Sequence, residues 1–186
     1  MSNNRWSTST GCPRWVPSSR RLPALVNFCF QPTIPFPYSL FPMPLTWTDT
    51  PDTVDWEALE TLYRLAPLGH KPAAHLRTVF TNSRFTCFVH DAQGVLVAAG
   101  RALADGADCA YICDVAVLPS HQGTGLGREV VARLVAASQG HQKILLYAMP
   151  GKEAFYRRLG FRRLLTAMAL FKDPAAAQAR GHLGDD

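Results

Sequence analysis

Apolar and polar positions alternate along residues 44–172 with two spacings, and each spacing predicts a different kind of element. Residues 53–65 predict a helix, because their apolar side chains fall on one helical face. Asp52 is its expected N-cap. A second helix is expected over residues 73–82, after prolines break the first. Three β-rich segments follow at residues 85–90, 95–103 and 109–117, and loops containing Gly94 and Gly106 separate them. This pattern predicts an antiparallel meander.

The second half of the chain continues with helices and further strands. Residues 125–138 predict a helix with Val130, Val131 and Leu134 facing inward. A short apolar strand over residues 143–148 and a helix over residues 152–159, ended by Gly160, come next. A last strand is expected over residues 162–171. The order predicts one α/β (α+β) domain, with a mixed, mostly antiparallel sheet and helices on both faces.

The two ends of the chain lack such periodicity. Residues 1–42 hold seven prolines, four arginines and no acidic residue, so we expect a disordered extension. This extension is either a transit peptide, whose usual composition is basic and acid-poor, or a stretch that precedes the true start at Met43. The amphipathic helix of a presequence is missing, and we therefore favour Met43. Residues 43–172 form the expected domain, and residues 173–186 a flexible tail.

Charge and cysteine usage narrow the classes of function. The net charge of +5 comes almost entirely from the N-terminal arginines, because residues 43–186 carry 15 Lys and Arg against 14 Asp and Glu. A nucleic-acid-binding domain would need a basic face, so we expect no nucleic-acid partner. The five cysteines lack a Cys-x-x-Cys spacing, which favours reduced thiols and no metal site. No apolar run reaches membrane-spanning length, and we expect a cytoplasmic protein, or an organellar one if residues 1–42 are a transit peptide.

The strongest indication of function is a glycine-rich loop between the strand over residues 109–117 and the next helix. Successive glycines let backbone N–H groups converge on an anion, and the start of a helix adds free donors and positive potential. This arrangement favours a diphosphate. The loop does not match the dinucleotide-binding fingerprint, because Arg128 stands where its third glycine would fall. The chain also lacks the phosphate loop of NTPases, in which Ser or Thr follows Gly-Lys, because Glu153 follows Gly151-Lys152.

The loop instead has Gln-x-x-Gly-x-Gly spacing at Gln122, Gly125 and Gly127, which resembles the pyrophosphate loop of the GNAT superfamily of acyl-CoA-dependent N-acetyltransferases. Two further segments resemble the same superfamily: the strand at residues 114–117, and residues 154–161 with their Phe-Tyr helix ending at Gly160-Phe161. The resemblance implies acetyl-CoA as cofactor, with no metal. The implied cofactor-binding residues are Val115, Ala116, Val117, Gln122, Gly123, Thr124, Gly125, Leu126, Gly127 and Arg128.

By the same resemblance, the backbone N–H of Val115 or a neighbour polarises the acetyl carbonyl, and Tyr156 is the general acid for the leaving thiolate. Asp114 is the candidate base, although a carboxylate there could equally cap a loop or pair with an arginine. His121 has a suitable pKa but flanks the phosphate loop. Ala148-Met149-Pro150 stands where many relatives have an Asn or Ser near the pantetheine, so we expect Met149 to form an apolar wall.

The substrate is expected to be a primary amine, and three functions remain open. An acceptor pocket lined by mostly apolar and aromatic residues favours a small-molecule amine. The candidates for that lining are Tyr63, Leu65, Ala66, Pro67, Leu68, His70, Phe80, Tyr147 and Met168. The alternatives are an acetyltransferase for protein N-termini or lysines, and a non-catalytic acyl-CoA-binding module. A homodimer is left open.

Overall fold

The computed structural model describes residues 44–66 and 68–184. Its strands are β1 (Thr46–Thr48), β2 (Phe85–His90), β3 (Leu96–Ala104), β4 (Cys109–Val117) and β5 (Lys143–Leu145). Its helices are α1 (Trp56–Leu65), α2 (Ala73–Thr81), α3 (Leu126–Ala137), α4 (Glu153–Arg157) and α5 (Pro174–Ala179), with a 3₁₀ turn η1 (Pro119–His121) before α3. The predictions for residues 1–42 and for Met43 as the start lie outside the described residues.

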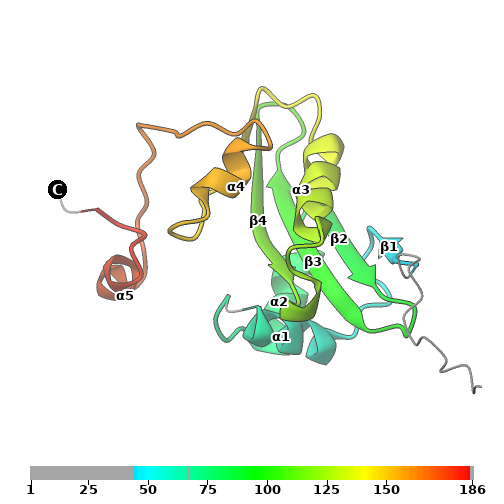
Figure 1. Ribbon diagram of the computed structural model, residues 1–186. Helices are drawn as coiled ribbons and strands as arrows, with labels where there is room; N and C mark the ends of the chain where they lie inside the picture. The colour runs from blue at the N-terminus through cyan, green and yellow to red at the C-terminus, as the bar shows by residue number, and fades with distance from the viewer. Residues whose placement is uncertain (1–43, 67, 185–186) are drawn as a thin grey trace, which may run out of the picture. The chain divides into compact units, whose positions relative to one another are not determined.

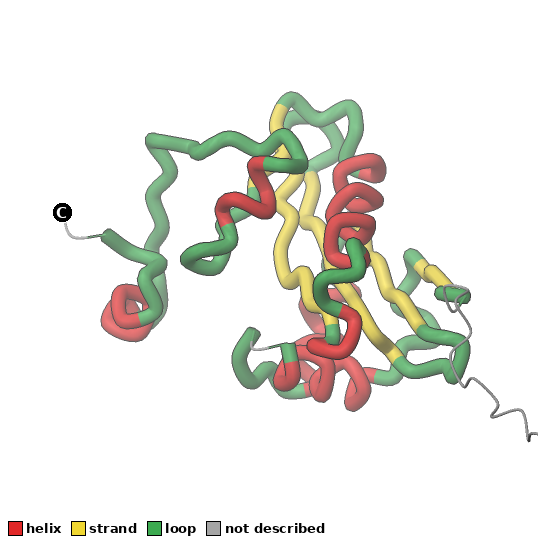
Figure 2. The backbone as a smooth tube through the Cα atoms, viewed as in Figure 1, coloured by secondary structure: helices red, strands yellow, loops and turns green. Residues whose placement is uncertain are grey.

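The five strands form one sheet in the order β1-β2-β3-β4-β5. The first three pairings are antiparallel, and β5 lies parallel to β4. Short hairpins join β2 to β3 and β3 to β4, α1 and α2 lie between β1 and β2, and the parallel pair β4–β5 is joined through the crossover helix α3 (Figures 1 and 2). The predicted fold class is confirmed: a mixed, mostly antiparallel sheet with helices on both faces.

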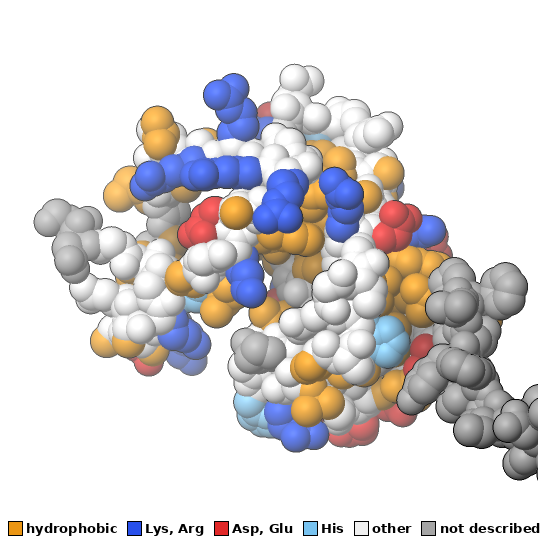
Figure 3. Space-filling view, viewed as in Figure 1, with side chains coloured by type: hydrophobic (Ala, Val, Ile, Leu, Met, Phe, Trp, Pro, Cys, Tyr) orange, Lys and Arg blue, Asp and Glu red, His pale blue; other side chains and the backbone are white. Residues whose placement is uncertain are grey.

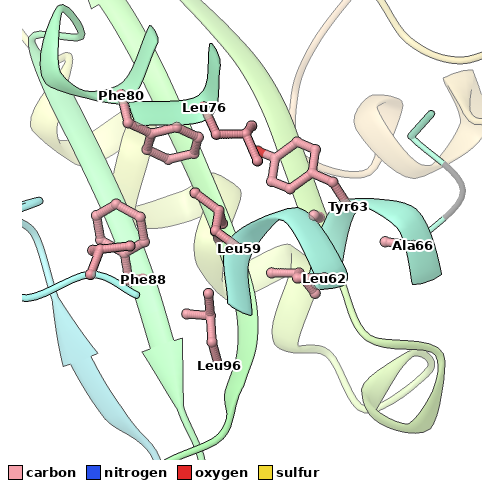
Figure 4. Close-up of a cluster of buried hydrophobic side chains, with 11 residues drawn as sticks. Leu59, Leu62, Tyr63, Ala66, Leu76, Phe80, Phe88 and Leu96 are labelled. Atoms are coloured by element: carbon pink, nitrogen blue, oxygen red, sulfur yellow. The ribbon is translucent and has the colours of Figure 1, made fainter. Parts of the chain in front are cut away.

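The core lies on both faces of the sheet, because side chains alternate along each strand. Phe88 of β2 packs beneath α1 and α2 in a cluster with Leu59, Leu62 and Phe80 (Figure 4). The residues on either side of Phe88 in β2 point to the opposite face, where they join the cluster that α3 covers. Both clusters are nearly inaccessible to water, and they hold the strands that carry the site.

Helix α1 begins later than the sequence predicts. Its N-cap is Asp55, not Asp52, and the Asp55 carboxylate accepts hydrogen bonds from the backbone N–H groups of Glu57 at 3.0 Å and Ala58 at 3.1 Å. Asp52 instead stands in the preceding turn, which the Val54 N–H closes onto the Pro51 carbonyl. A cap satisfies donors that the first turn leaves free, so the start falls where these bonds form.

Two C-terminal predictions differ from the structure. Residues 162–171 form no strand, and Leu165, Met168 and Leu170 are 81%, 96% and 100% exposed. A strand needs a neighbour for its backbone groups, and no described segment pairs with this one. The expected irregular tail contains α5, which starts with Pro174 in its first turn and is capped by the Asp173 carboxylate. Ala177 of α5 is buried.

Candidate active site

The site begins at a bulge in β4. Ala99 pairs with Ala116 and Arg101 pairs with Cys113, so Gly100 of β3 faces two residues of β4, Asp114 and Val115. Asp114 has a φ of 55°, in the left-handed region that few non-glycine residues occupy. A bulge leaves one residue outside the strand pairing and turns the local backbone and side chains to new directions. Both bulge residues, Asp114 and Val115, line a cavity beside the sheet.

Polar side chains from three other elements hold the bulge. The buried Tyr63 hydroxyl of α1 donates a hydrogen bond to the Asp114 backbone carbonyl. The Asp114 carboxylate forms ion pairs with the Lys71 ammonium and, at 2.6 Å, with Nε of Arg101. Arg101 Nη1 also donates to the Ser83 hydroxyl at 3.1 Å. These bonds offset the strain at Asp114 and fix its side chain between two cations.

This environment sets the ionisation of the bulge residues. Burial alone would raise the pKa of the Asp114 carboxyl, but hydrogen bonds and positive charge from Lys71 and Arg101 outweigh it and hold that pKa below its usual range. Asp114 is therefore an anion at neutral pH. Burial raises the pKa of the Cys113 thiol to about 11, and that of Tyr63 well above its usual value, so both stay protonated. Of the roles left open for Asp114, the structure shows the pairing with an arginine.

A cavity of ≈ 470 Å³ lies beside the bulge. The bulge and the adjoining ends of β4 and β5 supply one wall, the α1–α2 connection supplies another, and α4 and the residues around α5 supply the rest. The residues that line the cavity are Leu68, Gly69, Lys71, His75, Arg101, Tyr111, Ile112, Cys113, Asp114, Val115, Leu146, Tyr147, Met149, Tyr156, Phe171, Arg180 and His182. Asp114, Val115 and Tyr156, predicted from distant parts of the sequence, are thus brought together.

Tyr156 projects from α4 into this cavity. Its ring packs edge-on against Phe155 and Phe161, with ring centroids 5.0 Å and 6.1 Å apart. Burial raises the pKa of the Tyr156 hydroxyl above its usual value, so it remains a proton donor at neutral pH. Within residues 44–66 and 68–184 no group forms a hydrogen bond with this hydroxyl, and a molecule in the cavity can accept one from it.

The glycine-rich loop follows β4 directly. Gly123 and Gly125 have φ values of 79° and 93°, which glycine adopts without strain. The Gln122 side-chain amide donates to the Val117 carbonyl at 3.0 Å, and the Thr124 hydroxyl donates to the His121 carbonyl at 2.7 Å. The first bond holds the loop against the end of β4, and the second joins the loop to η1.

The loop's backbone donors are mostly free. The Gln122 N–H is used by the Pro119 carbonyl. In the part of the chain that the structure describes, the N–H groups of Gly123, Thr124, Gly125, Gly127 and Arg128 have no hydrogen-bond acceptor. They stand at the N-terminus of α3, where the helix dipole adds positive potential, and such a set of donors fits a diphosphate.

The sequence missed several residues of the cavity. Lys71, Arg101, Arg180 and His182 line it, yet no local pattern marks them. Some expected acceptor residues lie elsewhere: Phe80 belongs to the core, Tyr63 is buried behind the bulge, and Met168 is exposed. Leu68, Tyr147 and Met149 do line the cavity, as expected.

A comparison with known protein families identifies the domain. The model of the Acetyltransferase (GNAT) family matches residues 53–161, more than half of the chain. The chain belongs to the GNAT family. The family resemblance drawn from the loop, the strand before it and the Phe-Tyr helix is thereby confirmed.

Individual proteins similar in sequence to this GNAT chain are also named as N-acetyltransferases. Serotonin N-acetyltransferase 2, chloroplastic, of Oryza sativa is 38% identical over 113 residues, which cover 58% of this chain and 56% of the relative. GCN5-related N-acetyltransferase 1, chloroplastic, of Arabidopsis thaliana is 48% identical over 67 residues, 35% of this chain and 34% of the relative. The chain thus spans about half or less of the length of these relatives.

Solved structures show the same fold. A GNAT-family acetyltransferase from Streptococcus pneumoniae superimposes with a TM-score of 0.58 at 20% identity, covering 70% of this chain and 100% of that chain. In the described residues, no group of three or more His, Cys, Asp or Glu side chains could hold a metal ion. No helix of the described part has the length and apolar character needed to cross a membrane.

Proposed function

We propose that the protein transfers the acetyl group of acetyl-CoA to the primary amine of a small molecule. The observation that carries this proposal is the continuity of three parts: free loop amides at the start of α3, the bulged strand β4, and Tyr156 in the same cavity as Val115. The loop amides would hold the diphosphate of acetyl-CoA. Val115, Ala116 and Val117 would lie along its pantetheine arm, and the acyl end would reach the cavity.

Acetyl-CoA supplies an acetyl thioester whose carbonyl carbon an amine can attack. The backbone N–H of Val115 would donate a hydrogen bond to the carbonyl oxygen as negative charge develops there. As the C–N bond forms and the C–S bond breaks, Tyr156 would donate its hydroxyl proton to the leaving sulfur, the nitrogen would release a proton to water, and Tyr156 would regain a proton from water. Burial raises the pKa of this hydroxyl, so the proton stays on Tyr156 at neutral pH until negative charge develops on the sulfur.

Asp114 takes a different part in this proposal from the catalytic base considered in the sequence. A carboxylate held between Lys71 and Arg101, with its pKa lowered, is a weak proton acceptor at neutral pH. We assign it to positioning: it fixes the bulge that aims Val115 and holds the two cations at the cavity wall.

Two observations support a small acceptor. The cavity volume of ≈ 470 Å³ falls within the range of small-molecule sites, about 300–1,000 Å³. The rice relative is named for the acetylation of serotonin, a small amine. Both plant relatives are named as chloroplastic, which favours the organellar alternative for residues 1–42 over the cytoplasmic location.

The proposal is tested by measuring CoA release from acetyl-CoA against a panel of small primary amines and a panel of peptides with free N-termini or lysines. Amine-dependent release that is at least tenfold faster with small amines supports it. Faster release with the peptides would favour the protein acetyltransferase, and acetyl-CoA binding without release by any acceptor would favour the non-catalytic module.

A further inference from the structure

The charges around the cavity are unbalanced. Lys71, Arg101 and Arg180 line it as cations, and Asp114 is the single carboxylate among the described residues that do so. Glu60 of α1 does not line the cavity; its carboxylate accepts the Ala73 N–H at 2.7 Å and lies 3.7 Å from His70. Other Lys and Arg side chains gather on the outer surface over α4 and the segment after it (Figure 3), which adds to the positive potential on this side.

The imbalance is sharpest at the bulge. Lys71 and Arg101 share one carboxylate, so the three groups carry one positive charge in excess. Their side chains are 26%, 12% and 13% exposed for Lys71, Arg101 and Asp114, which limits compensation by water. An unpaired charge at a partly buried site is unfavourable, and an anion bound there offsets it.

The two cations also retain unused donors. A lysine ammonium has three N–H groups and an arginine guanidinium has five. Within residues 44–66 and 68–184, Lys71 donates one hydrogen bond, to Asp114, and Arg101 donates two, to Asp114 and Ser83. Lys71 lies on the α1–α2 connection and lines the same cavity as Val115 and Tyr156, so one ligand in the cavity can contact all three residues.

We propose that the acceptor amine carries an anionic group, a carboxylate or a phosphate, which binds at Lys71 and Arg101 while the amine faces Val115 and Tyr156. This inference rests on the proposed acetyl transfer and specifies the substrate class of the same site. The surplus charge also disfavours an ammonium in the cavity, so it favours the neutral, nucleophilic form of the amine.

Matched acceptors test the inference. Each pair differs only in the anionic group: 2-phenylethylamine and phenylalanine, tryptamine and tryptophan, ethanolamine and O-phosphoethanolamine. The first two pairs report on a carboxylate and the third on a phosphate. We expect the anionic member of at least one pair to have a kcat/KM about 10- to 100-fold higher, mainly through KM, as charged hydrogen bonds provide.

Two lysine variants test whether the preference for anionic acceptors depends on Lys71. Lys71→Met leaves Asp114 paired with Arg101 one to one, and it should reduce the anionic-to-neutral ratio of kcat/KM by about tenfold or more. Lys143→Met is the matched control, because Lys143 also pairs with a carboxylate, that of Asp108, but does not line the cavity. It should leave the ratio unchanged.

Product binding gives a second readout that needs no turnover. The anionic products are N-acetylphenylalanine, N-acetyltryptophan and N-acetyl-O-phosphoethanolamine. In calorimetry, at least one of them should bind at least tenfold more tightly than the N-acetyl derivative of the neutral amine of its pair. Equal or weaker binding of every acid, or equal kcat/KM within all three pairs, would overturn the inference while amine-dependent CoA release still supports acetyl transfer. Tighter binding of the acids without any CoA release would support the anion site and reject the proposed function.

Discussion

Gly100 of β3 is the point where the packing of α3 and the bulge of β4 meet, and Gly100→Ala tests both. A Cβ atom at this position would lie 2.9 Å from Val130 Cγ1 and 3.0 Å from Leu134 Cδ1 on α3. It would also lie 3.4 Å from Val115 Cγ2. The first two distances are too short for carbon atoms, which prefer about 3.5–4.0 Å. The methyl group therefore has to push α3 away or displace the side chains beneath it.

The expected cost follows from this geometry. Overpacking a close-packed core costs about 1–3 kcal/mol, and Val130 and Leu134 are 0% and 1% exposed, with no space into which to retreat. For a domain of this size, each kcal/mol lowers Tm by about 4 °C. We therefore expect Gly100→Ala to lower Tm by about 4–12 °C. Because Val115 is the third neighbour, the kcat/KM of acetyl transfer should fall as well.

Thermal unfolding followed by circular dichroism measures Tm, and urea unfolding measures the free energy of unfolding, with two comparisons. Gly184→Ala is the control, since a Cβ there meets nothing within 4 Å, and it should change stability by less than about 0.5 kcal/mol. The double variant Gly100→Ala/Val130→Ala removes the Cγ1 that the new methyl contacts, and it should recover at least about 0.5 kcal/mol relative to the sum of the single effects. Strictly additive effects, or a Gly100→Ala protein as stable as wild type, would refute the packing described here.

Three further predictions concern the loop, the bulge and the tyrosine. Gly125→Ala places a side chain at a φ of 93°, so it should cost about 1–2 kcal/mol in urea unfolding and weaken acetyl-CoA binding; unchanged values of both would contradict the role of this loop. Asp114→Asn should destabilise the fold by roughly 3 kcal/mol at pH 7, because two cations lose their carboxylate. Since the folded-state pKa of Asp114 lies below the unfolded value, its stabilisation is fully present above about pH 4 and is lost as pH falls through the folded-state value; a stability gap between wild type and variant that widens as pH falls below about 4 would contradict this. Tyr156→Phe should lower kcat about 100-fold with acetyl-CoA affinity unchanged in calorimetry, and an unchanged kcat would exclude it as the general acid.

The regular elements could be predicted because their signals are local. The strands β2 and β4 and the helix α2 fall within a residue of their expected bounds, since apolar periodicity and turn glycines mark them. The sequence predicts the cap of α1 at Asp52, and the structure places it at Asp55, because an aspartate at either position can cap and only the folded turn decides. The segment over residues 162–171 has the composition of a strand, but a strand also needs an edge that accepts it, and the sequence does not show that edge.

Only those parts of the site that have local sequence signals could be predicted. The glycine-rich loop and Tyr156 belong to contiguous motifs, whereas the cations of the bulge do not. Lys71 and Arg101 lie 43 and 13 positions from Asp114, and the fold alone brings them to one carboxylate. The bulge itself depends on the register between β3 and β4, and no single residue of either strand predicts that register.

The central claim is that the amides at the start of α3 hold a diphosphate and so place an acyl thioester along β4. Calorimetry with acetyl-CoA and with S-acetylpantetheine, which lacks the diphosphate and the nucleotide, tests it most directly, with inorganic pyrophosphate as competitor. We predict that acetyl-CoA binds at least 100-fold more tightly than S-acetylpantetheine and that pyrophosphate weakens its binding in wild type but much less in Gly125→Ala. Equal affinity for the two thioesters, with no effect of pyrophosphate, would contradict the account.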